Sequence, residues 1–144
     1  MAIALDEARA ALAHGDVPIG AIVARRDTGE VIARRHNERE LTNDPTAHAE
    51  VLALRDAAAA LGTWRLDDCV LVVTLEPCPM CAGATLAARI TEVVFGAADP
   101  KAGAMGSLYS FGSDPRLNHE VRVLDGVAAH EAAELLTGFF SKLR

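Results

Sequence analysis

The chain has 144 residues, of which 51% are hydrophobic and only 4% aromatic, and its formal net charge is −6 at pH 7. This length and apolar content suit one globular domain with an aliphatic core, so we expect a single domain over residues 1–144. The acidic balance argues against broad, sequence-independent binding to nucleic acid, which usually rests on a basic surface, but leaves room for a local basic patch.

Neither a membrane helix nor a secretory leader is expected. The chain contains no run of about 18 uncharged apolar residues, the minimum length for a membrane span. Its first residues reach the acidic pair Asp6-Glu7 too early for a signal peptide. The three cysteines are an odd number, and two of them suit a metal site described below, so a disulfide framework is not expected. We therefore expect a cytoplasmic protein without membrane association.

Hydrophobic spacing and turn signals define the first part of the chain. Apolar residues at helical spacing predict an amphipathic helix over about 3–13, ended by Gly15 in a left-handed conformation. The apolar stretch 17–24 predicts a central strand, with Pro18 tolerated only near its start. The segment 30–37 is its expected hairpin partner.

A second helix and a third strand are predicted in the middle of the chain. A polar connection over 38–44 leads to Pro45, which signals a helix start when it stands at a first helical position. The Ala- and Leu-rich segment 47–61 is the predicted helix, and Gly62 ends it. The continuous apolar segment 69–75 then predicts a buried strand.

The remaining elements complete an α/β pattern. Pro79 opens a predicted helix that runs to about 89, and 91–97 is another apolar strand. The glycine-rich segment 99–118 is long enough to be functional, and we expect a short helix within it at 107–111. The last two elements are a strand and a helix, at 120–124 and 128–143. This order predicts a mixed five-stranded sheet with helices on both faces, in which the last two strands lie parallel.

Two short motifs, far apart in the sequence, carry the residue types of a metal site. Cys78 and Cys81 stand three apart at a predicted helix start, so both sulfurs can reach one ion, and the helix N-terminus favours their thiolate form. His48 near another predicted helix start offers an imidazole. These three groups fill three corners of a tetrahedral zinc site and leave the fourth open, as in catalytic zinc. Glu50 lies off the face of His48, where it would carry protons rather than bind the ion.

Other uses of these residues remain open at this point. A lone Cys-x-x-Cys followed by a helix also suits a redox pair, although Pro77 and the distant His-x-Glu do not belong to that pattern. A closed structural zinc site would need a fourth ligand, and no other histidine shows a paired spacing with the cysteines. The residues favour an open, catalytic zinc over both alternatives.

The motifs also resemble those of a known family. Residues 48–50 and 77–81 match the His-x-Glu and Pro-Cys-x-x-Cys signatures of the zinc nucleobase deaminases. The chain is most similar to the bacterial tRNA adenosine deaminases, which convert the wobble adenosine of an anticodon to inosine. That similarity covers nearly the whole chain and includes Asn37 and the stretches 17–21, 44–50, 74–78, 81–84, 94–97, 103–107, 118–119 and 139–140.

The resemblance implies a three-layer, cytidine-deaminase-like fold and a homodimer that binds a tRNA anticodon loop. It also implies one Zn²⁺ per chain on His48, Cys78 and Cys81, with Glu50 as the catalytic residue. In the family, this glutamate accepts a proton from the attacking water, passes it to N1 of adenine and later supplies one to the departing amine. The implied reaction is hydrolytic deamination of adenosine to inosine with release of ammonia.

The resemblance further implies substrate contacts, and some of these residues also have a structural alternative: a turn for Asn37, a solvated turn for Asp99 and Lys101, and a place in the core for Phe140. Asn37 matches the side-chain amide that hydrogen-bonds the purine, whereas a turn would use the same residue. The resemblance assigns the contact with the base to the Ala49 backbone, and the walls of the pocket to Glu76 and Pro77. Asp99 and Lys101 correspond to a loop that contacts the flanking nucleotides. Phe140 corresponds to a position near the anticodon loop. Candidates for phosphate contact are Arg34, Arg35, Arg39, Lys101, Lys142 and Arg144, although scattered surface charge explains any single one better.

Two competing functions share part of this pattern. A deaminase of a free base or nucleoside, such as guanine or cytosine, has the same zinc signature, but the segment 103–107 and the terminal aromatic residues favour an RNA substrate. The other alternative is a non-catalytic, zinc-stabilised binding module. Glu50 argues against it, because a structural zinc site has no use for that carboxylate.

Overall fold

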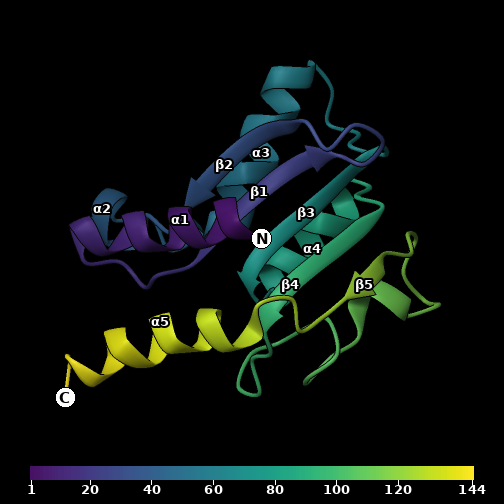
Figure 1. Cartoon of the computed structure of the whole chain (residues 1–144). Helices are drawn as coiled ribbons and strands as arrows, with labels where there is room; N and C mark the ends of the chain where they lie inside the picture. The colour runs from purple at the N-terminus through teal and green to yellow at the C-terminus, as the bar shows by residue number, and fades with distance from the viewer.

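A computed structural model describes residues 1–144 and contains one mixed sheet with the strand order β2-β1-β3-β4-β5 (Figure 1). The strands are β1 Gly20–Arg25, β2 Val31–His36, β3 Cys69–Leu75, β4 Glu92–Ala97 and β5 Arg122–Leu124. β1 pairs antiparallel with both β2 and β3, whereas β3, β4 and β5 are parallel. The predicted hairpin, the central position of β1 and the parallel last pair are confirmed.

Helices cover both faces of this sheet and create three layers. The helices are α1 Ala2–Ala11, α2 Arg39–Thr42, α3 Ala49–Leu61, α4 Pro79–Ala87 and α5 Ala129–Ser141, with short 3₁₀ helices at Leu12–His14 and Phe111–Ser113. α1 and α5 lie on one face, and α3 and α4 lie on the other (Figure 1). The expected three-layer α/β architecture is confirmed. None of the helices has the length and apolar character that crossing a bilayer requires.

Successive side chains along a strand point to opposite faces of the sheet, so one sheet packs against two layers of helices. Val23, Val73 and Phe95 belong to the main core of 19 buried residues, which α3 and α4 complete. Ile22 and Val72, one position along their strands, pack instead in a smaller cluster with α1. The central strands are thus buried on both faces, which explains why they read as continuous apolar runs in the sequence.

α1 approaches the sheet most closely at Gly20. A Cβ atom at this position would lie 1.9 Å from the carbonyl oxygen of Ala4, so the contact requires glycine. On the helix side, Ala4 and Ala8 are fully buried and equally small. Close packing of small residues therefore replaces the bulky aromatic packing that this composition lacks.

The polar connection expected after β2 contains a short helix, so this prediction is wrong. Residues 39–42 form α2, and the buried carboxylate of Asp16 accepts hydrogen bonds from the N–H groups of Glu40 and Leu41 in its first turn. Such acceptors satisfy N–H groups that have no partner within the helix. The residue that stabilises α2 thus comes from a different part of the chain.

The expected start of α3 is also wrong by two residues. The helix begins at Ala49 rather than at 47, and Pro45 lies in a turn before it. The carbonyl of Ala47 accepts a hydrogen bond of 3.0 Å from the N–H of Glu38, which ties this segment to the end of β2. His48 consequently has an extended backbone and stands just outside the helix.

The short helix expected at 107–111 does not form. Met105 and Ser110 instead pair as an isolated antiparallel bridge, and a 3₁₀ turn follows at Phe111–Ser113. The intervening residues form a tight loop whose conformation is set by a contact with the end of β3, described below.

Candidate active site

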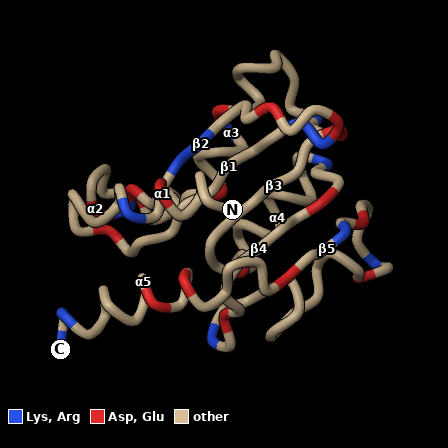
Figure 2. The backbone as a smooth tube through the Cα atoms, in the orientation of Figure 1, with Lys and Arg blue, Asp and Glu red and all other residues tan.

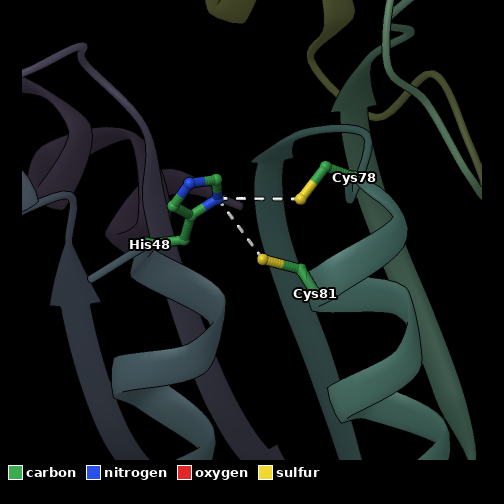
Figure 3. A group of neighbouring side chains, drawn as sticks. All are labelled: His48, Cys78 and Cys81. Atoms are coloured by element: carbon green, nitrogen blue, oxygen red, sulfur yellow. Dashed lines mark hydrogen bonds between the residues drawn. The ribbon is translucent and has the colours of Figure 1, made fainter. Parts of the chain in front are cut away.

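The three predicted metal ligands meet where two helices begin (Figure 3). His48 immediately precedes α3, Cys78 immediately precedes α4, and Cys81 lies in the first turn of α4. The Nδ1 atom of His48 is 3.7 Å from the sulfur of Cys78 and 3.5 Å from the sulfur of Cys81. All three ligand atoms lie within 4.8 Å of one another. These residues could therefore hold one metal ion.

The distances between these atoms fit a tetrahedral zinc ion. With Zn–N and Zn–S distances of roughly 2.0 and 2.3 Å, a nitrogen and a sulfur on one tetrahedral ion stand about 3.5 Å apart. The observed N···S distances of 3.5 and 3.7 Å lie within about 0.2 Å of this value. Two sulfurs and an imidazole are donors that zinc prefers, and three protein ligands are typical of catalytic zinc. Both the donor set and its dimensions therefore fit.

Local interactions favour ionised sulfur at this position. A hydrogen bond from the Cys81 thiol lowers the pKa of Cys78 to about 4. The same contact, together with burial, raises the pKa of Cys81, so Cys78 gives up its proton first. The Cys78 sulfur in turn raises the pKa of His48. The positive ends of both helix dipoles lie at these groups and further stabilise anionic sulfur.

Glu50 lies in the first turn of α3, beside the ligands but outside the group that could bind the metal. The residue is only 4% exposed, and its Oε2 atom has no hydrogen-bond partner. Burial raises the pKa of Glu50 to about 7, and the carboxylate is close enough to Cys81 for each group to affect the pKa of the other. A buried oxygen without a partner is costly in a folded protein. The position therefore suits a group that exchanges protons with a bound substrate.

Asn37, directly after β2, is held beside these residues. Its Oδ1 atom accepts a hydrogen bond of 2.9 Å from the N–H of Ala49, and the residue is buried. The backbone N–H of Asn37 donates to the carbonyl of Ile19, which fixes the strand end. The side-chain NH₂ group of Asn37 remains as the free donor. Because the N–H of Ala49 is already used, a contact between Ala49 and a base would involve a different atom.

Glu76 and Pro77 connect the end of β3 to the loop over residues 99–107. Both are buried, and the Glu76 carboxylate accepts hydrogen bonds from three backbone N–H groups of this loop. The carbonyl of Pro77 accepts a hydrogen bond of 2.8 Å from the N–H of Ala104. These two residues therefore shape any neighbouring pocket through the loop that they hold.

The remaining predicted contacts lie at the surface. The Oδ1 atom of Asp99 accepts the N–H groups of Lys101 and Ala102, which folds the start of the loop and leaves Oδ2 free. Lys101 is exposed, and Phe140 on α5 is 45% exposed. Both line one groove of about 460 Å³ at the C-terminal end of α5. The fold thus brings together two predicted contacts that are far apart in the sequence.

Two of the six candidates for phosphate contact are engaged in ion pairs. Arg34 pairs with Glu7, and Arg35 pairs with both Glu38 and Asp56. These ion pairs explain the presence of both arginines without any contact to RNA. The candidates outside such ion pairs are Arg39, Lys101, Lys142 and Arg144.

The sequence pointed to the segment 103–107 as a whole but gave no individual role to Gly103 or Ser107, both of which contact Glu76. Ser107 donates its N–H and its hydroxyl to the carboxylate. At Gly103, a Cβ atom would lie 2.3 Å from the same carboxylate. The available signal was a charged residue between an apolar strand and Pro77, since a buried carboxylate requires donors. The sequence does not show which residues supply them.

Known proteins with similar sequences include tRNA-specific adenosine deaminases. The whole chain, residues 1–144, matches the family described as MafB19-like deaminase. It is 49% identical over 141 residues to a tRNA-specific adenosine deaminase of Bacillus subtilis, covering 98% of this chain and 86% of the relative. It is 46% identical over 142 residues to a tRNA-specific adenosine deaminase of Aquifex aeolicus, covering 99% of this chain and 92% of the relative.

Solved structures with the same fold include enzymes that act on different purines. One comes from studies of A-to-I editing by tRNA:A34 deaminases at the wobble position of transfer RNA. It is 48% identical with a TM-score of 0.90, and the match covers 94% of this chain and 97% of that one. Another is a guanine deaminase from Nitrosomonas europaea, 30% identical with a TM-score of 0.82, for which the match covers 97% of this chain and 82% of that one.

Proposed function

Because this chain belongs to the MafB19-like deaminase family and has tRNA-specific adenosine deaminases among its relatives, we infer that it deaminates the wobble adenosine of a tRNA anticodon hydrolytically. The products are inosine and ammonia. The observation that carries the chemistry is the buried, unpartnered carboxylate oxygen of Glu50 beside the group His48, Cys78 and Cys81. The choice of substrate rests on the 46–49% identity, over nearly the whole chain, to tRNA-specific adenosine deaminases.

Residues 1–144 constitute one zinc-dependent deaminase domain that binds one Zn²⁺ per chain. His48, Cys78 and Cys81 are its ligands, and their soft sulfur donors and N···S distances support zinc over a hard cation such as magnesium. When bound there, zinc would supply Lewis-acid chemistry and lower the pKa of water from about 15.7 towards about 7.

Glu50 moves the protons of the reaction. Its raised pKa, about 7, lies near neutral pH, so the carboxylate can both accept and return a proton. It accepts the proton lost by the attacking water and passes it to N1 of the purine. It then takes the proton of the new C6 hydroxyl group and delivers it to the departing amine, which leaves as ammonia while C6 becomes the carbonyl carbon of inosine. Because Glu50 is buried, bulk water does not compete for these transfers.

Asn37 orients the purine. Its Oδ1 atom is used by the N–H of Ala49, so its NH₂ group is the donor that faces the ring, and N7 of a purine is an acceptor. Adenine and guanine share N7, so this contact selects a purine over a pyrimidine without distinguishing between the two purines. Asn37 therefore argues against cytosine as the substrate.

The flanking nucleotides contact the loop after β4 and the end of α5. A single-stranded anticodon loop can stack bases on an exposed aromatic ring and place phosphates near cations. Phe140, Lys101 and Arg144 line one groove, and the C-terminal end of the chain is basic (Figure 2). Asp99 supports this surface from the start of the loop, because its Oδ1 atom accepts the N–H group of Lys101, which lines the groove. A local site of this kind is compatible with a net charge of −6.

The protein acts as a cytoplasmic homodimer, in keeping with a tRNA substrate. Support for a dimer comes from an apolar groove of about 380 Å³ on the outer face of α4, which is lined by Gly83, Leu86, Ala87, Arg89, Phe111, Leu117 and Asn118. Met80, also exposed on α4, is adjacent in sequence to Cys81, so a second copy seated here would lie near the metal site of this chain. We expect light scattering to give twice 15.2 kDa for the native chain and half that mass for Leu117→Glu. A monomeric native protein at micromolar concentration would contradict the dimer.

Substrate choice is tested by turnover. An anticodon stem-loop with a wobble adenosine should yield inosine and ammonia in equal amounts, because its unpaired base can enter the pocket with both flanking nucleotides attached. Free guanine, cytosine, adenine and adenosine should show little turnover, since they lack those nucleotides. The measurement is ammonia release together with nucleoside analysis of the RNA.

A stem-loop with its only loop adenosine outside the wobble position serves as the control for site selection. Deamination of free guanine with no reaction on the wobble adenosine would contradict the tRNA assignment. It would favour the activity of the guanine deaminase relative instead.

A further inference from the structure

The carboxylate of Glu76 accepts four hydrogen bonds, all from one loop. Its Oε1 atom accepts the N–H groups of Met105 at 3.0 Å and Ser107 at 2.9 Å. Its Oε2 atom accepts the N–H of Asp99 at 2.9 Å and the hydroxyl of Ser107. An ionised carboxylate has about four acceptor positions, so no lone pair remains for a substrate. Glu76 therefore acts on the loop and not directly on RNA.

The loop is built to enclose this carboxylate. Glu76 is only 2% exposed, and the absence of a side chain at Gly103 makes room for it. All four acceptor positions of the carboxylate face N–H or O–H donors of this loop, so the enclosure is complementary to a carboxylate.

The same residue connects the loop to the metal centre. Glu76 precedes Pro77, whose carbonyl accepts the N–H of Ala104, and Pro77 precedes the ligand Cys78. Asp99 opens the loop, and its own side chain then folds the turn that presents Lys101. A shift at Asp99 would therefore displace surface groups while the Cys78 segment stays in place.

We propose that Glu76 is a positioning residue that sets the loop over 99–107 at a fixed distance from the metal centre, and thereby determines how tightly the nucleotides flanking the target base are held. The proposal rests on the inferred RNA deaminase function. It assigns Glu76 to the recognition of flanking nucleotides, whereas Glu50 and the metal ligands serve the chemistry.

Glu76→Gln tests this division because glutamine can replace only part of the carboxylate. Its single oxygen can still accept the N–H groups of Met105 and Ser107, and its NH₂ group can donate to the Ser107 hydroxyl. The N–H of Asp99 then faces an NH₂ group and loses its acceptor. The substitution should therefore free the start of the loop and leave its end in place.

Two measurements follow from this expectation. Hydrogen exchange at the Asp99 amide, followed by NMR, should accelerate by about tenfold or more, with smaller changes at Met105 and Ser107. With the wobble-adenosine stem-loop, KM should rise by about tenfold while kcat changes by less than about threefold. Zinc content should not change. Glu120→Gln, at an exposed glutamate outside the loop, is the matched control and should behave like the native chain.

Unchanged exchange at Asp99 together with unchanged KM would overturn the proposal. A fall in kcat that accompanies zinc loss would also overturn it, because Glu76 would then support the metal centre. Ser107→Ala removes one of the four donors, the Ser107 hydroxyl. It should raise the exchange rate at the Asp99 amide and the KM for the stem-loop, both by less than Glu76→Gln does. This second variant keeps the proposal testable if Glu76→Gln does not fold. If the native enzyme ignores the stem-loop, the inferred function fails, whereas the exchange measurement still decides the role of Glu76.

Discussion

Glu50→Gln should lower kcat on the stem-loop by about 10²- to 10⁴-fold, the range that general acid–base groups contribute, while the protein keeps its zinc and its fold. Glutamine has nearly the same shape but cannot accept and return a proton. The carboxylate is buried with an unpartnered oxygen, which is a cost to stability that the neutral amide reduces. The midpoint of thermal unfolding should therefore stay the same or rise.

Three measurements on the same preparation separate these effects: inosine formation, zinc per chain and thermal unfolding. Glu120→Gln, on the exposed surface, makes the same chemical change away from the site and should retain native turnover. Turnover by Glu50→Gln close to the native rate would exclude Glu50 as the proton carrier. Loss of activity caused only by unfolding would appear as a lowered unfolding midpoint.

Cys81→Ser should abolish turnover by removing zinc. Cys81 is fully buried and one of only three protein ligands, and a serine hydroxyl is a much poorer zinc donor than a thiolate. The native chain should also be less stable after chelation, because a metal present at a hundred times its dissociation constant adds about 2.7 kcal/mol to the free energy of unfolding. The variant, which starts without zinc, should not respond to the chelator.

Cys69→Ala provides the matched control, since Cys69 is the one cysteine outside the metal group. It is buried at the start of β3, so its replacement should cost about 1 kcal/mol of stability with zinc and turnover retained. A Cys81→Ser protein with a full equivalent of zinc and native activity would contradict the assigned ligand set. Zinc loss in Cys69→Ala would do so as well.

Local patterns in the sequence predicted the elements whose causes are local. The strands β1 and β3 are buried on both faces, and their continuous apolar runs reveal this. Gly15 and Gly62 adopt the left-handed conformation at the helix ends where each was expected. The spacing of Cys78 and Cys81 likewise placed both sulfurs at the start of one helix.

Where prediction and structure differ, a distant partner decides the outcome. α2 was unexpected because the Asp16 carboxylate that stabilises its first turn comes from a different segment. α3 starts later than Pro45 indicated because the side chain of Asn37 accepts the N–H of Ala49. Sequence periodicity contains no information about such long-range hydrogen bonds.

The sequence by itself determined the donor chemistry of this protein: an imidazole, two thiols at a helix start and a nearby carboxylate, on an aliphatic α/β framework. The tertiary structure decided how these groups meet, because α3 and α4 begin side by side and place the sulfurs 3.5 and 3.7 Å from the His48 nitrogen. It also decided that Glu50 has an unpartnered oxygen and that Glu76 holds a loop. The physical reason is that side-chain identity sets what a group can donate, accept or coordinate, whereas burial and partners depend on segments that are adjacent only in the folded chain.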